Sequence, residues 1–212
     1  MQHEREAGVP VVHKPYHVDT LGAPFKVILK NGVKFGVDKE TGEETVSIPD
    51  TIGLINAVVR ARVCHARKLN GEEIKFLRKA VGVRAKVLAE FLDMTPEHFS
   101  RCENGMKTMS VQSEKQFRIS AYLASMLETP EDMFNRNIPK PKLPSNAAKK
   151  IEQSAVDFVK VFMSMKIEVF FDPDNELSFE FSRSPGRKKG SKPGEFDTED
   201  GNWSGGCDLL AA

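Results

Sequence analysis

The sequence, 212 residues long, is poor in cysteine and has no long apolar run. Its three cysteines, Cys64, Cys102 and Cys207, form no C-x-x-C pair, which argues against a zinc ribbon or a disulfide framework and fits a reducing cytosol. His65 follows Cys64, but a metal site needs three or four ligands, so we expect no metal. No apolar stretch approaches the ~20 residues of a membrane helix, and residues 1–11 lack the apolar core of a signal peptide. These absences predict a soluble, cytoplasmic protein with no membrane partner.

Catalytic motifs are also missing from the sequence. It shows no Ser/His/Asp order, no paired-carboxylate constellation, no P-loop and no nucleotide-binding glycine motif. The glycine-rich stretch 201–206 follows no expected strand and is not predicted to be a phosphate loop. Residues 1–20 are polar with three irregularly spaced histidines, a pattern that favours a flexible arm over a metal site. We therefore expect no enzymatic activity and no cofactor.

Charge is nearly balanced over the chain but uneven along it. The formal net charge is +1, so the whole chain gives no electrostatic argument for a nucleic-acid partner. Between Arg60 and Arg118, however, thirteen Lys and Arg stand against seven Asp and Glu. Such a basic block suits a polyanionic partner, although a solvated helical surface has the same composition.

The segment 21–67 predicts a small unit of β-hairpin and helix. Apolar residues alternate on both sides of Asn31-Gly32, a strong two-residue turn signal, so we expect an antiparallel hairpin over residues 25–37. Residues 45–48 are expected to add a third strand. A helix is then expected to begin at Pro49-Asp50.

Beyond the central region, the sequence predicts three further segments. Four prolines mark residues 128–145 as a linker. Residues 146–182 predict a helix followed by a hairpin of two alternating runs, 167–171 and 177–181. Because a lone two-stranded hairpin is marginal in water, we expect this unit to serve dimerisation or partner binding. The charged, Gly- and Ser-rich residues 183–212 predict a disordered tail.

Residues 68–127 have helical periodicity and contain two short helices joined by a tight turn. These two helices and their turn form a motif of twenty residues that begins at Ala85. Its fifth residue is Ala89, which is small enough for the two helices to cross closely. Its ninth residue is Asp93, where the chain must adopt a left-handed conformation that Asp tolerates better than most residues. On the helix before the motif, Phe76 is expected to pack on the N-terminal unit.

The second helix of the motif is predicted from its ends and its faces. Thr95 is a good N-cap, Pro96 fits the first helical position, and Gly105 ends the helix. Phe99 and Cys102 are expected to be buried. The remaining side chains, which are free to act, are those of Glu97, His98, Ser100 and Arg101.

The residues 69–79, Leu88-Ala89 and 99–105, which include the pattern S-R-x-E-N-G, resemble the phage repressor/Cro-type (Xre family) helix-turn-helix regulators. Within that family the chain looks most like the antitoxin-type regulators of the MqsA and HigA kind, although it lacks their zinc-binding cysteines. The expected fold class is α+β. An all-α five-helix helix-turn-helix domain is flanked by the β-rich N-terminal unit and by the C-terminal helix and hairpin.

The resemblance implies a homodimer that represses transcription from a palindromic double-stranded DNA operator. Carried over by position, Glu97 and Arg101 read base edges, while Ser100 and Asn104 contact the backbone. For Arg101 we expect a bidentate contact to guanine. Glu97 could accept from a cytosine amino group or merely stabilise the helix N-terminus. His98 is grouped with the base-contacting candidates, and it could also approach a phosphate or be a plain surface residue.

The sequence departs from the family pattern at the start of the motif. The family usually has Ser-Gln there, and the Gln clamps a phosphate, whereas this chain has Arg84-Ala85. Arg84 or Lys86 is expected to take over that contact. After the second helix, Lys107 and Thr108 form a polar loop that is expected to touch the DNA backbone.

A second hypothesis belongs to another class. The chain would be an antitoxin or adaptor that binds a toxin or other partner protein through residues 146–182, and its DNA binding would be autoregulatory. The two hypotheses are compatible.

Overall fold

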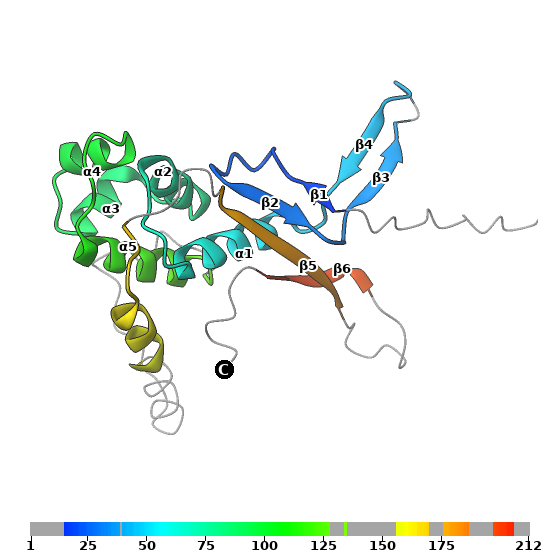
Figure 1. Ribbon diagram of the computed structural model, residues 1–212. Coiled ribbons are helices and arrows are strands. Elements are labelled where there is room, and N and C mark those ends of the chain that lie inside the picture. Colours follow the sequence, from blue (N-terminus) through cyan, green and yellow to red (C-terminus); the bar gives the residue numbers. More distant parts are fainter. Residues whose placement is uncertain are drawn as a thin grey trace, which may run out of the picture.

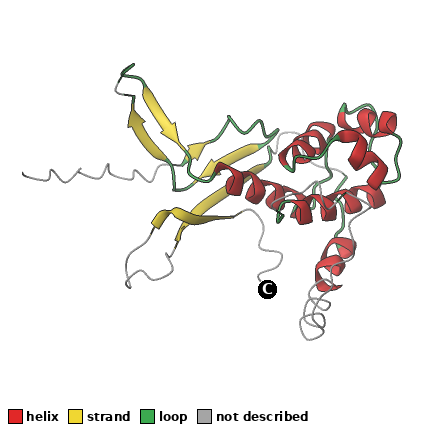
Figure 2. Ribbon diagram, turned by 180° about the vertical axis from the view of Figure 1, so that it is seen from behind, coloured by secondary structure: helices red, strands yellow, loops and turns green. Residues whose placement is uncertain are grey.

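The computed structural model describes residues 15–38, 40–127, 134, 156–169, 176–186 and 197–205. The fold is α+β, as the sequence predicts, with a small sheet at one end and a central region of five helices, α1–α5, at the other (Figures 1 and 2). A further helix at residues 156–164 and two strands, β5 and β6, follow these helices in the chain.

The main sheet has four strands in the order β1-β2-β5-β6. Its strands are β1 (Tyr16–His17), β2 (Lys26–Leu29), β5 (Ser178–Gly186) and β6 (Asp197–Gly205). The central pair, β2 and β5, runs parallel, with Val27 beside Phe179 and Leu29 beside Phe181. These four side chains are buried, so the sheet brings together apolar residues that are about 150 positions apart in the chain.

A second, smaller sheet is the ribbon of β3 (Lys34–Val37) and β4 (Glu44–Ser47), which projects from the main sheet in Figure 1. Its turn is held by Asp38, whose carboxylate accepts hydrogen bonds from the N–H groups of Glu40 and Thr41 at 2.7 and 3.2 Å. The strand predicted over residues 45–48 is confirmed as β4. It pairs with β3 in a separate two-stranded sheet and does not extend a hairpin that includes β2.

The predicted hairpin around Asn31-Gly32 is wrong, because β2 and β3 belong to different sheets. The Asn31 side chain accepts from the N–H of Arg183 and donates to its carbonyl, at 2.6 and 3.3 Å. Gly32 has φ +82°, and a Cβ there would lie 3.0 Å from both Arg183 and Trp203. The turn signal thus marks a bend that docks on β5 and β6 instead of closing a hairpin.

The structure also corrects both ends of the chain as the sequence predicted them. Tyr16 and His17, assigned to the flexible arm of residues 1–20, form β1 against β2. The run 177–181 does not pair with 167–171, since it contributes to β5 at the centre of the main sheet. Two parts of the predicted tail, residues 183–212, belong to the sheet: residues 183–186 continue β5, and residues 197–205 form β6. In the described part of 167–171, Glu168 instead forms an isolated parallel bridge with Arg67.

Trp203 explains why β6 has a fixed place. Its indole is buried, its Nε1–H donates to the carbonyls of Pro49 and Asp50 at 3.1 and 3.2 Å, and the Arg183 guanidinium lies 5.8 Å from its ring centroid. A buried indole with a satisfied N–H anchors a strand through both packing and hydrogen bonding. Sequence reasoning did not find this residue, although it is the single tryptophan of the chain.

Helix α1 (Thr51–Cys64) connects the sheet to the other helices (Figure 1). It begins where predicted, because Asp50 caps it by accepting from the N–H of Gly53 at 2.9 Å. One part of α1 packs on β6, and another part packs on α2 and α5. The five-helix region therefore includes a helix that the sequence placed in the N-terminal unit of residues 21–67.

The remaining helices of the central region are α2 (Gly71–Ala80), α3 (Ala85–Phe91), α4 (Pro96–Glu103) and α5 (Val111–Ala124). Phe76 of α2 packs edge-on against Phe25, with ring centroids 5.6 Å apart, so its predicted contact with the N-terminal unit is confirmed.

The predicted linker, residues 128–145, lies outside the described residues except for Phe134. This residue is buried against Phe91 of α3, with ring centroids 5.1 Å apart. The helix predicted in the segment 146–182 is seen at residues 156–164, where Phe158 and Phe162 pack on Tyr122 of α5. The C-terminal helix is therefore attached to the central helical region through α5.

Candidate nucleic-acid interface

The pair α3 and α4 has the geometry expected of a helix-turn-helix. Asp93 in the turn has φ 52°, the left-handed conformation predicted for the ninth position of the motif. Ala89 and Leu88 of α3 are buried where α3 packs on α4. A small side chain at Ala89 lets the two backbones approach, and a residue that tolerates positive φ turns the chain between them.

Helix α4 is capped at both ends as predicted. The Thr95 hydroxyl accepts from the N–H of His98 at 3.2 Å, and Pro96 occupies the first turn, where its missing N–H costs nothing. After the helix, Gly105 has φ +72° and redirects the chain. Phe99 and Cys102 are almost completely buried, so the predicted inner face of α4 is confirmed.

The outer face of α4 collects four of the predicted DNA-contacting residues. Glu97, Ser100, Arg101 and Asn104 are all exposed and, at i, i+3, i+4 and i+7, they share one face. The Asn104 amide donates to the Ser100 hydroxyl at 3.4 Å. His98 is half-buried and so less accessible than these four residues.

Arg101 is available to a ligand. No ion pair joins its guanidinium, or the carboxylate of Glu97, to another residue in the described part of the chain. Figure 1 places α3 and α4 at the end of the molecule opposite the main sheet, so that β1–β6 do not cover this face. An uncommitted arginine on an open helix face can approach a planar acceptor pair such as the edge of a guanine.

The remaining predicted contacts flank α4. Arg84 is the N-cap residue of α3, without a side-chain capping bond, and both it and Lys86 are exposed. Lys107 and Thr108 are exposed in the loop between α4 and α5. These basic side chains are thus exposed on the elements before and after α4, and the structure does not select between Arg84 and Lys86 as the phosphate clamp.

Sequence reasoning missed the residues that orient α4. Arg78 of α2 donates through Nε to Glu103 at 2.7 Å and through a terminal nitrogen to the carbonyl of Val83 at 3.0 Å. At Gly71, a Cβ would lie 2.7 Å from the carbonyl oxygens of Cys102 and Glu103, so α2 begins directly against the backbone at the end of α4. Glu103 is the Glu of S-R-x-E-N-G, but the sequence does not indicate its partner, because Arg78 is 25 positions away.

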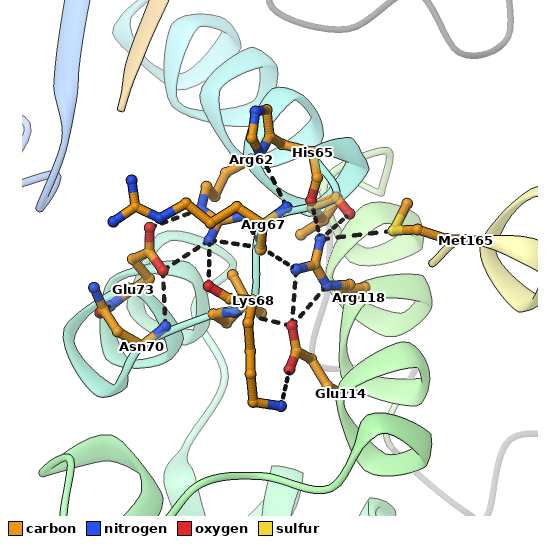
Figure 3. Close-up of polar contacts among 11 residues, drawn as sticks. Arg62, His65, Arg67, Lys68, Asn70, Glu73, Glu114, Arg118 and Met165 are labelled. Atoms are coloured by element: carbon orange, nitrogen blue, oxygen red, sulfur yellow. Dashed lines mark hydrogen bonds and ion pairs between the residues drawn. The ribbon is translucent and has the colours of Figure 1, made fainter. Parts of the chain in front are cut away.

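A second group of charged residues lies behind the interface and joins α1, α2 and α5. We call it the buried ion network, and Figure 3 shows its contacts. Its members are Arg62, Lys68, Glu73, Glu114 and Arg118.

On the α2 side of the network, Arg62 donates to both carboxylate oxygens of Glu73 at 2.8 Å and to the carbonyls of Arg67 and Lys68 at 3.1 Å. Glu73 also accepts from the N–H of Asn70, while the Asn70 side chain accepts from the N–H of Glu73. This reciprocal capping box fixes the start of α2. The segment between α1 and α2 is thereby held by side chains from both helices.

On the α5 side, Glu114 accepts from Arg118, from Lys68 Nζ at 2.9 Å and from the N–H of Leu69 at 2.9 Å. Arg118 also donates to the carbonyls of Val63 in the last turn of α1 and of His65 and Arg67 in the α1–α2 connection. Lys68 reaches further, to the carbonyl of Met109 in the loop after α4, at 2.9 Å. The network therefore fixes the loop that carries Lys107 and Thr108.

Burial changes the proton affinity of three groups near this site. Desolvation and the positive charge of Arg62 lower the pKa of His65, whose Nδ1 accepts from the N–H of Arg67 at 3.2 Å. Desolvation raises the pKa of the Cys102 thiol, which is therefore a poor thiolate nucleophile. Desolvation also lowers the pKa of Arg118, while the adjacent Glu114 raises it.

No family model, curated protein or solved structure matches this chain. Within the described ranges, no group of three or more His, Cys, Asp or Glu residues is placed to hold a metal ion. None of the helices in the described part is long and apolar enough to cross a membrane. The evidence for the candidate interface is therefore the geometry of α3 and α4 and of the residues that orient α4.

Proposed function

We propose that this protein is a sequence-specific double-stranded DNA-binding transcriptional regulator that reads bases through α4. The observation that carries the proposal is the outer face of α4, where Glu97, Ser100, Arg101 and Asn104 are exposed together on a helix whose other face is buried. A DNA major groove is wide enough to admit such a helix, and its base edges present the donors and acceptors that these side chains complement.

Each side chain then has a distinct part in binding. Arg101 donates two hydrogen bonds to a guanine, and Glu97 either accepts from a cytosine amino group or supports the N-terminus of α4. Ser100 and Asn104 bind the DNA backbone, and His98 lies at the edge of the base-contacting set. Arg84 or Lys86 on one side, with Lys107 and Thr108 on the other, contact phosphates and fix the position of the helix in the groove. Such contacts position the protein without specifying sequence.

We further propose that the protein acts as a homodimer and represses by occlusion of a palindromic operator. Two copies related by a two-fold axis would place two α4 helices in half-sites about one helical turn, roughly 34–36 Å, or a multiple of it, apart. A regulator of this kind works where the DNA is, in the cytoplasm of a bacterium or of a phage-infected cell. The antitoxin or adaptor alternative relied on a separate C-terminal unit, and no contact among the described residues favours it over DNA binding.

The first experiment selects DNA from a random duplex library with the full chain and sequences what is retained. We expect an enriched palindrome. Fluorescence anisotropy on that duplex then compares Arg101→Ala with Lys166→Ala, which removes an exposed positive charge outside the interface. Loss of a bidentate contact worth about 1–3 kcal/mol weakens binding about 5- to 150-fold and relaxes the preference at one base pair. An unselective library, or equal affinities for the two variants, contradicts the proposal.

A further inference from the structure

A hollow of about 520 Å³ lies beside α2. Three parts of the chain wall it: the loop between β1 and β2, Ile55 of α1, and the outer face of α2. The volume falls within the range of pockets that hold small molecules, about 300–1,000 Å³. We call this hollow the α2 pocket. None of its lining residues is one of the proposed DNA contacts.

The floor of the α2 pocket is apolar and held in place. Leu21, Pro24, Ile55 and Phe76 line it, and Leu21 and Ile55 are only half-buried because they face the hollow. The Phe76 ring packs edge-on against Phe25, which itself packs on Phe179 of the main sheet. Aromatic contacts to the sheet hold this floor in place, and it offers apolar surface to a ligand.

The rim of the pocket carries two ammonium groups. Lys75 and Lys79 are one turn apart on α2, both are exposed and both line the hollow. Neither forms an ion pair with a carboxylate of the described residues, in contrast to Lys26, Lys30 and Lys68, which do. Two uncommitted cations above an apolar floor complement a molecule with an apolar body and one anionic end.

We propose that the α2 pocket binds a small amphipathic monocarboxylate, whose aliphatic or aromatic body lies on Ile55 and Phe76 and whose carboxylate lies between Lys75 and Lys79. Glu72, the third charged residue of the lining, disfavours a second negative charge on the ligand. DNA is the competing occupant of the two lysines, but a phosphate backbone has no use for the apolar floor. The site extends beyond the proposed regulatory function and does not depend on it.

The test titrates the labelled full-length chain with sodium octanoate and follows the backbone amides by heteronuclear NMR, in the absence of DNA. We expect saturable shifts at Gly22, Lys75 and Ala80, and much smaller ones with n-octanol, which has the same chain but no charge. No saturable shift at these amides, or equal affinity for octanoate and n-octanol, overturns the proposal.

Two variants with a matched control locate the site. Lys75→Gln with Lys79→Gln is expected to weaken octanoate binding by about fivefold or more, the effect of losing exposed ion pairs. Lys34→Gln with Lys166→Gln removes the same charge from exposed positions elsewhere and is expected to leave the affinity unchanged. Ala80→Phe fills the hollow and is expected to abolish binding. Equal effects of the two double variants contradict the site.

A DNA titration of the same variants separates this proposal from the regulatory one. If Lys75→Gln with Lys79→Gln loses DNA affinity while octanoate affinity stays, the lysines are phosphate contacts and the α2 pocket proposal is wrong. If no DNA sequence is selected but octanoate binds as expected, the pocket stands and the regulatory proposal falls.

Discussion

Glu114 is the residue at which most of the buried ion network meets. Its carboxylate has no exposed surface and accepts hydrogen bonds from Lys68, Leu69 and Arg118. Across the described residues, no buried side-chain nitrogen or oxygen is left without a hydrogen-bond partner. A fully satisfied buried network of this kind specifies one arrangement of the elements around it, because each alternative leaves a buried charge unpaired.

Glu114→Ala therefore has a large expected cost. It leaves the guanidinium of Arg118 buried without its carboxylate, and removal of one partner of a buried ion pair lowers the free energy of unfolding by about 3–5 kcal/mol. Urea denaturation of the variant measures the loss. Glu40→Ala, at an exposed carboxylate in the β3–β4 turn, is the control and should change stability by no more than about 0.5 kcal/mol. A similar loss in both variants contradicts the role of the network.

His65 makes the stability of the protein depend on pH. Burial and Arg62 lower its pKa in the native state below the ordinary value of 6.5, so between these two values the unfolded chain binds more protons than the native protein. The contribution of His65 to stability is therefore complete above pH 6.5 and is lost as the pH falls through the native pKa. Arg67 and Arg118 act in the same direction, and Glu168 opposes them.

We expect the free energy of unfolding, measured by urea denaturation, to decrease from pH 7 to pH 5. His65→Asn, which keeps an acceptor for the N–H of Arg67 but does not titrate, should reduce the slope over this interval. The comparison uses slopes because the variant also loses the edge contact between His65 and Phe179. An unchanged slope would show that other groups cause the dependence.

At the scale of elements, the β3–β4 ribbon differs from the main sheet. Phe35 and Val46 are cross-strand partners and share a face with Val37, yet all three side chains are exposed. Its described contact with the rest of the apolar residues is the edge packing of Tyr16 on Phe35, with centroids 5.9 Å apart. A two-stranded ribbon with so little burial is held mainly by its own hydrogen bonds.

Native-state hydrogen exchange tests this difference between the two sheets. The hydrogen-bonded amides of β3 and β4 should exchange with far smaller protection factors than those of β2 and β5, because local opening of the ribbon exposes little buried apolar surface. The amide of Phe181, in the central strand β5, is the internal reference. Comparable protection in the two sheets would mean that the ribbon is stabilised by contacts other than those described.

The helices of the interface show why elements with local signals can be predicted. Thr95 and Pro96 start α4, Asp93 turns the chain before it and Gly105 ends it, and each acts on backbone atoms within a few residues. The outer face of α4 followed from the same local pattern. The contact of Arg78 with Glu103, which orients the helix, joins residues that are 25 positions apart and has no such local signature.

For the whole molecule, β6 connects the C-terminal part of the chain to the helical region. Its Trp203 bonds to Pro49 and Asp50 at the start of α1, and its strand pairs with β5. The composition of residues 183–212 predicts a disordered tail, whereas the structure makes residues 197–205 part of the main sheet.

Shortening the chain from its C-terminal end tests whether residues 197–205 contribute to stability. Ending the chain after residue 186 removes the buried indole of Trp203 and the partner of β5, and loss of a buried aromatic side chain alone costs about 3–5 kcal/mol. We expect a correspondingly lower free energy of unfolding by urea denaturation, a large part of the ~5–15 kcal/mol of a typical domain. Ending the chain after residue 205 is the control and should change it little. Equal stability of the two truncated chains would support the prediction of a disordered tail and contradict the structural role of β6.

The sequence by itself determined where α1 begins, both ends of α4 and the residues exposed on α4, since helix ends and faces depend on neighbours within about four positions. Only the tertiary structure decided the sheet and the buried ion network. The alternation of β2 and β5 was visible in the sequence, but a strand pattern does not name its partner, and the partners are about 150 residues apart. Arg62, Glu114 and Arg118 likewise look like surface charges until α1, α2 and α5 enclose them.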